Sequence, residues 1–120
     1  MLIGFAQDVC MGLSIIHTKG LVHCDIKPQN ILVEVRQRDR LNCVITDFGI
    51  STIVDRTSLL VAEFKVVNIR ANSAAYAAPE VFRHQARPVK HALDIYSFAV
   101  LLYFTLTVKN PWSSNRKRIY

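Results

Sequence analysis

Two short runs rich in β-branched residues, separated by five polar residues, constrain the fold of this chain most strongly. The runs are residues 31–35 and 41–45, and residues 36–40 between them are Arg-Gln-Arg-Asp-Arg. Such runs favour strands, and a short charged connection between them is typical of a β-hairpin. Antiparallel pairing brings the outer ends of two strands side by side. The sequence therefore predicts that Asn30, before the first run, approaches Asp47, just past the second.

The polar residues around this hairpin have the chemistry of a phosphoryl-transfer site. Asn30 and Asp47 offer hard oxygen atoms of the kind that Mg²⁺ prefers. Asp25 is a carboxylate that could accept a proton, and Lys27 adds a positive charge beside it. A positioned base, oxygen ligands for a metal and a cation for developing charge are the groups that phosphoryl transfer needs. An isolated aspartate here would more often be a turn residue, so the interpretation depends on the whole pattern.

Three motifs in a fixed order resemble the catalytic domain of eukaryotic-type protein kinases. They are His-Cys-Asp-Ile-Lys-Pro-Gln-Asn at residues 23–30, Asp-Phe-Gly at residues 47–49 and Ala-Pro-Glu at residues 78–80. The family pattern is His-Arg-Asp-Leu, an asparagine four residues later, then Asp-Phe-Gly and Ala-Pro-Glu. The resemblance covers residues 2–112 and corresponds to the first half of the large C-terminal lobe. It implies an α+β, mainly helical fold with a small β-hairpin at the catalytic loop.

The resemblance gives each polar residue of the site a role. Asp25 would accept the proton of the substrate hydroxyl, and Lys27 would stabilise charge on the transferred phosphoryl group of ATP. Asn30 and Asp47 would bind Mg²⁺ and thereby ATP. A lysine two residues after the aspartate resembles the serine/threonine-specific branch of the family. The implied reaction is transfer of the ATP γ-phosphoryl group to a serine or threonine hydroxyl of a protein substrate.

Five further residues would support the site in this resemblance. Ser73 and Tyr76 stand in the substrate-docking loop, and the serine replaces a threonine that usually interacts with the catalytic base and lysine. His23 would pack beneath the catalytic loop, and Phe48 would be a core residue. Gly49 would give the backbone of its segment conformational freedom.

Two acidic residues would have structural roles. Glu80 would be buried and would need an arginine from the end of the large lobe, which this chain does not include. Asp94 has two interpretations, because it could cap the N-terminus of its own helix. In the family, the matching aspartate instead reaches back to the backbone of the catalytic loop, and the run at residues 94–100 resembles that motif.

Apolar periodicity predicts two helices around the site. Apolar residues recur at helical spacing over residues 2–18, and Lys19-Gly20 then ends the segment. Residues 92–108 are apolar nearly all round, which predicts a helix buried on most sides and stopped by Asn110-Pro111-Trp112. The segments expected between the helices are the catalytic loop 23–30, the hairpin 31–45 and the activation segment 47–80.

Composition describes one globular domain and limits its partners. The 120 residues have a hydrophobic fraction of 51% and a charged fraction of 20%, typical of a folded core. The net charge of +6 suits phosphate-bearing partners, but the basic residues are scattered, so we expect no nucleic-acid site. The segment 93–108 is short for a membrane span and contains Asp94, so we expect no membrane partner.

The three cysteines predict reduced thiols. They form no Cys-x-x-Cys pair and, with the nearby histidines, no familiar zinc spacing. Together with the absence of an evident signal peptide, this favours a cytoplasmic protein.

The chain departs from the family pattern at four points. Cys24 replaces an arginine that in many kinases pairs with a phosphate on the activation segment, and a thiol cannot make that pair. We therefore expect that phosphorylation of hydroxyls in this segment does not switch the site through Cys24. These hydroxyls are those of Ser51, Thr52, Thr57 and Ser58. At two further points, Asn72 and Ala99 stand where glycine is usual, and both changes are mild.

The fourth departure is the largest. The 120 residues contain no glycine-rich loop, strand lysine or partnering helix glutamate ahead of the catalytic loop, so the expected ATP affinity of these 120 residues alone is weak or nil. Two interpretations remain open. The chain could be a fragment of a serine/threonine protein kinase, as the intact motif residues favour. It could also be a catalytically inactive, kinase-derived interaction module or the product of a truncated pseudogene, as the missing lobe favours.

Overall fold

The computed structural model describes most of the expected elements. The residues described are 2–36, 40–49, 51–53, 73–82 and 90–112. Thr57, Ser58 and Asn72, residues 37–39 of the expected charged connection, and much of the expected activation segment lie outside them.

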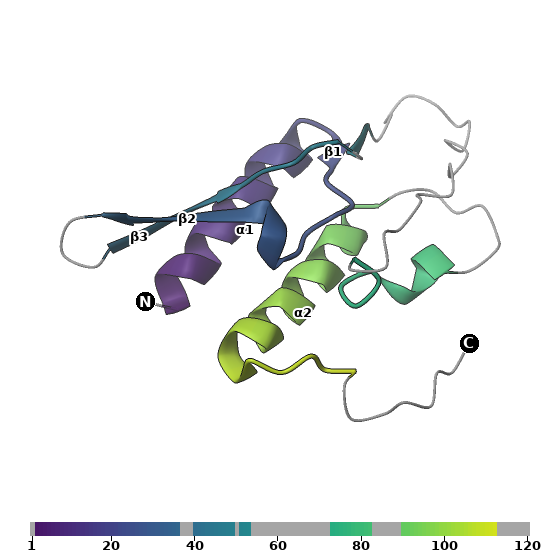
Figure 1. Ribbon diagram of the computed structural model, residues 1–120. Coiled ribbons are helices and arrows are strands. Elements are labelled where there is room, and N and C mark those ends of the chain that lie inside the picture. Colours follow the sequence, from purple (N-terminus) through teal and green to yellow (C-terminus); the bar gives the residue numbers. More distant parts are fainter. Residues whose placement is uncertain (1, 37–39, 50, 54–72, 83–89, 113–120) are drawn as a thin grey trace.

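Two α-helices, α1 (Leu2–Thr18) and α2 (Ala92–Thr107), form the larger part of the fold. They lie side by side and run in opposite directions (Figure 1). After α1 the chain turns at Gly20, whose φ of 74° is a left-handed conformation that glycine adopts at little cost. One stripe of α1 is buried, as the amphipathic pattern predicts. Its members are Phe5, Val9, Leu13 and Ile16.

The hairpin consists of β2 (Ile31–Arg36) and β3 (Arg40–Ile45) in antiparallel pairing. The register pairs Ile31 with Ile45 and Arg36 with Arg40. Alternate residues therefore point to opposite faces of the hairpin. One face packs on α1 and contributes Ile31, Cys43 and Ile45 to the core. The opposite face carries the pair Leu32 and Val44, both exposed.

A second, very short sheet ties the catalytic loop to the chain beyond Asp-Phe-Gly. Strand β1 (Leu21–Val22) pairs antiparallel with β4 (Thr52–Ile53). Two single-turn 3₁₀ helices complete the described elements, η1 (Pro28–Asn30) and η3 (Pro79–Phe82). The entry to the catalytic loop thus lies beside the segment that follows Gly49.

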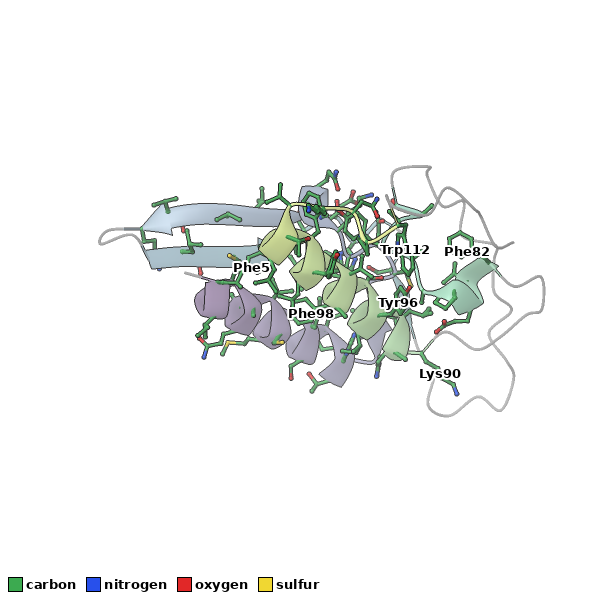
Figure 2. All side chains as sticks on the ribbon, turned by 90° about the horizontal axis from the view of Figure 1, so that it is seen from below. Phe5, Phe82, Lys90, Tyr96, Phe98 and Trp112 are labelled. Carbon is green, nitrogen blue, oxygen red and sulfur yellow. The ribbon has the colours of Figure 1, made fainter. Side chains whose placement is uncertain are left out.

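Helix α2 is less buried than its sequence predicts. Its inward side chains include Phe98 and Leu101, which join the α1 stripe in one core cluster. Figure 2 labels Phe98 of α2 and Phe5 of α1. Ile95, Tyr103 and Leu106 are exposed on its other faces. The prediction of burial on most sides is therefore wrong, because the described segments pack against α2 mainly from the side of α1 and the catalytic loop.

Two helices with a small antiparallel hairpin confirm the expected α+β, mainly helical class. Among the described residues, neither helix combines the length and apolar character needed to cross a bilayer.

Candidate active site

Four of the predicted site residues converge in one polar network. The ammonium group of Lys27 donates to Asp25 Oδ2 at 2.6 Å and to Ser73 Oγ at 2.8 Å. The amide nitrogen of Asn30 donates to the same Oδ2 at 3.0 Å and to the Asp25 carbonyl at 2.7 Å. Lys27 and Asn30 are buried. A buried ammonium is costly unless it is paired, so the Asp25 carboxylate and the Ser73 hydroxyl stabilise Lys27 where it lies.

The hairpin positions Asn30 through backbone contacts. The amide of Asn30 donates to the Lys27 carbonyl at 3.0 Å, which closes η1. The Asn30 carbonyl then accepts from the Thr46 amide at 2.9 Å and from the Thr46 hydroxyl at 3.2 Å. Because Thr46 directly precedes Asp47, the antiparallel register brings the backbone of Asp47 to the Asn30 end of the hairpin.

Asp47 itself adopts a left-handed conformation, with φ of 61°. Its carboxylate is exposed, and Oδ1 accepts a hydrogen bond from the Gly49 amide at 3.2 Å. A Cβ atom at Gly49 would lie 3.1 Å from the same oxygen. Space beside the carboxylate is therefore a reason for glycine at this position, in addition to the expected freedom of the backbone.

His23 is fully buried beneath the catalytic loop. Its Nδ1 accepts from the Asp25 amide at 3.3 Å, and its Nε2 lies 2.9 Å from the Thr46 carbonyl. The neutral tautomer with hydrogen on Nε2 satisfies both contacts. His23 therefore links the catalytic loop to the end of the hairpin.

Phe48 differs from its predicted role. Its ring makes an edge contact with the His23 ring, with centroids 5.0 Å apart. The side chain is nevertheless 48% exposed. The prediction of a core residue is therefore wrong for this chain, because the described segments cover one part of the ring and leave the rest accessible to solvent.

Asp94 holds the catalytic loop from α2. One carboxylate oxygen accepts from the His23 amide and the other from the Cys24 amide, each at 2.8 Å. The residue is completely buried. The α2 terminus has no side-chain cap, so the second of the two interpretations describes the observed contacts. Cys24 has a φ of 66°, an uncommon conformation for a non-glycine residue.

The sequence patterns did not single out His17 as part of this support. Its Nε2 lies 2.8 Å from Asp94 Oδ2, and its ring stacks on the His91 ring with centroids 4.3 Å apart. A histidine in the last turn of α1 is an ordinary helix-terminal residue, so local sequence offers little signal for this contact. The sequence patterns also missed Thr46, because its contacts depend on the hairpin register.

The segment with Ser73 and Tyr76 lies beside the C-terminal part of α2. The Tyr76 ring makes an edge contact with the Phe104 ring at 6.4 Å, and burial raises the pKa of Tyr76. The indole Nε1 of Trp112 donates to the Ala75 carbonyl at 2.9 Å. From the sequence, Trp112 was expected only to follow the end of the helix. Trp112 is therefore a further contact residue that the sequence patterns missed.

Glu80 lies at the start of η3 and is half-buried. The prediction that Glu80 is buried is therefore wrong for this chain, because the described segments cover only part of the residue. Burial and the negative charge of Glu80 together raise the pKa of Tyr96.

The sequence matches the family model of the protein kinase domain over residues 2–120. The chain therefore belongs to the protein kinase family, which confirms the resemblance inferred from the three motifs.

Individual relatives are protein kinases by name, and two of the following three are named as serine/threonine kinases. The proto-oncogene serine/threonine-protein kinase mos of Sus scrofa is 32% identical over 115 residues, covering 96% of this chain and 30% of the relative. Calcium-dependent protein kinase 21 of Arabidopsis thaliana is 34% identical, covering 98% of this chain and 20% of the relative. A probable serine/threonine-protein kinase of Clostridium acetobutylicum is 36% identical, covering 95% of this chain and 16% of the relative. The chain thus spans less than a third of the length of these curated relatives and is a partial kinase domain of the serine/threonine type.

Proposed function

We propose that this chain supplies the catalytic loop of a protein serine/threonine kinase that transfers the γ-phosphoryl group of ATP to a protein hydroxyl. The observation that supports this most directly is the network in which Lys27 bridges Asp25 and Ser73 while Asn30 binds Asp25. A base, a cation and an amide are held together there by direct hydrogen bonds. Such preorganisation lowers the reorganisation needed at the moment of reaction.

The oxygen atoms of Asn30 and Asp47 fit Mg²⁺. Both hydrogen bonds of the Asn30 side chain use its nitrogen, which leaves the carbonyl oxygen as the atom that can face a cation. Asp47 presents an exposed carboxylate. Among the described residues, no group of three or more histidine, cysteine, aspartate or glutamate side chains could hold a metal. Two oxygen ligands nevertheless suit Mg²⁺, which retains waters and binds substrate phosphates.

In the proposed mechanism, Asp25 orients the acceptor hydroxyl and takes its proton. Its Oδ2 is already bound by Lys27 and Asn30, so Oδ1 is the oxygen that faces the hydroxyl. Lys27 stabilises negative charge on the transferred group. Asn30 and Asp47 would hold Mg²⁺, which when bound neutralises charge on the ATP phosphates.

The exposed face of the hairpin is suited to the base of ATP. Leu32 and Val44 form a cross-strand pair and are 62% and 49% exposed. In the hairpin this pair is next to the pair of Ile31 and Ile45, and Ile31 directly follows Asn30. A flat apolar surface beside phosphate-binding residues matches the combination that nucleotide sites need. We propose that this pair is the floor of the base site.

The decisive experiment measures phosphoryl transfer by the full-length protein. With labelled ATP, Mg²⁺ and a serine/threonine peptide library, wild type should label peptides, and Asp25→Asn should lose at least about 100-fold in kcat because the base is absent. Glu34→Gln, on the exposed part of the hairpin, should keep wild-type activity. A wild-type protein without transfer, or an active Asp25→Asn variant, would favour a non-catalytic interaction module.

We also propose a reducing compartment, such as the cytoplasm, for this protein. None of the three cysteines forms a disulfide, although Cys10 is exposed.

A further inference from the structure

The loop at residues 73–77 is held at three points. Ser73 Oγ accepts from Lys27 at its start. The Ala75 carbonyl accepts from the Trp112 indole at 2.9 Å, and the Tyr76 ring contacts Phe104. Within the loop, the Tyr76 amide donates to the Ser73 carbonyl at 3.0 Å. These contacts connect the catalytic loop at one end to α2 and the residues after it at the other.

Three of the five loop residues are alanines, at positions 74, 75 and 77. A methyl side chain cannot donate or accept a hydrogen bond. Between Ser73 and Tyr76, the loop can therefore be held by polar contacts only through its backbone. The Trp112–Ala75 bond is a polar contact of this kind, and it reaches the loop from 37 residues away.

The local structure around Trp112 keeps it in reach of the loop. Val108 has a φ of 54° and turns the chain at the end of α2. The Lys109 amide donates to the Thr107 hydroxyl at 3.2 Å, and the Trp112 amide donates to Asn110 Oδ1 at 3.0 Å. These contacts hold the backbone between the end of α2 and Trp112, from which the indole reaches the Ala75 carbonyl.

We infer that Trp112 is a positioning residue for the protein substrate. Its indole N–H holds the Ala75 carbonyl and thereby keeps residues 73–77 at a fixed distance from Lys27 and Asp25. The inference rests on the proposed function, in which these residues dock the substrate beside the catalytic base. Nothing in the contact involves Asn30, Asp47 or the exposed hairpin face. Loss of the N–H should therefore weaken use of the protein substrate without affecting ATP.

The first test is steady-state kinetics on the full-length protein with the peptide that wild type labels best in the library. Trp112→Phe keeps an aromatic ring but removes the donor, and it should raise the KM for peptide about three- to tenfold. The KM for ATP should stay within about twofold of wild type. Tyr103→Phe is the matched control, because it removes a polar group from an exposed aromatic residue on α2; both KM values should be unchanged.

The second test is hydrogen exchange of the backbone without substrate. Trp112→Phe should accelerate exchange of the Tyr76 amide, whereas Tyr103→Phe should not. Unchanged exchange, or equal rises in the KM values for peptide and ATP, would overturn the inference. If wild type transfers no phosphate, the proposed function fails, and the exchange result alone then decides whether Trp112 holds the loop. If wild type is active and Trp112→Phe behaves like Tyr103→Phe, the inference fails and the proposed function stands.

Discussion

Asp94 contributes a carboxylate from α2 to a loop that is about 70 residues away in the sequence. It accepts hydrogen bonds from two consecutive amides of the catalytic loop, and His17 contacts the same carboxylate. Since the Cys24 backbone is in an uncommon left-handed conformation, the loop depends on external partners to keep that shape. The position of Asp25, one residue further, follows from this anchor.

Replacement of Asp94 should therefore destabilise the domain strongly. Asp94→Ala leaves two buried amides without their acceptor, and we expect a loss of about 3 kcal/mol in the free energy of unfolding. Urea unfolding followed by circular dichroism measures this loss. Ser97→Ala is the control, because Ser97 is also buried on α2 but its hydroxyl donates to the Leu93 carbonyl of its own helix. A larger loss for Ser97→Ala than for Asp94→Ala would contradict the proposed anchor.

The cysteines should differ in their reactivity with pH. Burial and the nearby Asp8 carboxylate raise the pKa of the Cys43 thiol, whereas Cys10 is exposed. A raised pKa means a smaller thiolate fraction at any given pH, and the thiolate is the reactive form. Iodoacetamide should therefore label the exposed Cys10 before Cys43 at pH 8, and the labelling rate of Cys43 should increase when the pH is raised further. Mass spectrometry of timed samples checks both; equal profiles would be inconsistent with a buried Cys43.

At the scale of elements, the contact of α1 with β3 aligns the helix with the hairpin. Asp8 on α1 accepts a hydrogen bond from the Cys43 amide at 2.9 Å. Further along α1, a Cβ atom at Gly12 would lie 3.0 Å from Ile45 Cδ1. The absence of a side chain at Gly12 therefore permits the close approach of helix and strand. The hairpin ends that carry Asn30 and Thr46 are held by this same packing.

Two glycines of α1 allow this contact to be tested with one kind of substitution. Gly4 has no atoms within 4 Å of a Cβ position, so Gly4→Ala should stabilise the domain by about 0.5 kcal/mol through helix propensity alone. Gly12→Ala has the same propensity gain but forces Ile45 to move. We expect it to be less stable than Gly4→Ala by about 1 kcal/mol in thermal or urea unfolding. Equal gains for both variants would show that α1 and β3 are not closely packed at Gly12.

For the molecule as a whole, the described residues would form one side of the proposed nucleotide site. The Leu32 and Val44 face is exposed, and a tight small-molecule site usually encloses most of its ligand. We therefore predict that the 120 residues alone bind Mg-ATP with a Kd of about 1 mM or weaker. Isothermal titration calorimetry measures this, with Asp47→Ala as the control for metal-dependent binding. A micromolar Kd would show that the described residues suffice for binding.

Some features could be predicted from the sequence because their causes are local. The strand runs and their charged connection specify the hairpin, whose pairing places Asn30 beside Thr46 and the following Asp47. The stripe of α1 follows from helical periodicity. Lys27 and Asp25 are two residues apart, so their contact also needs little tertiary information.

Other features were decided by tertiary packing. The sequence left two interpretations for Asp94, and only the approach of α2 to the catalytic loop selects between them. The predictions that Phe48, Glu80 and the outer faces of α2 are buried were wrong. The type of a residue indicates whether it can be buried, but not whether a neighbouring segment covers it. The Trp112–Ala75 bond likewise depends on a distant backbone carbonyl, which no side-chain pattern encodes. Local propensity thus determined the elements and the order of the polar residues, whereas long-range contacts determined which of those residues meet.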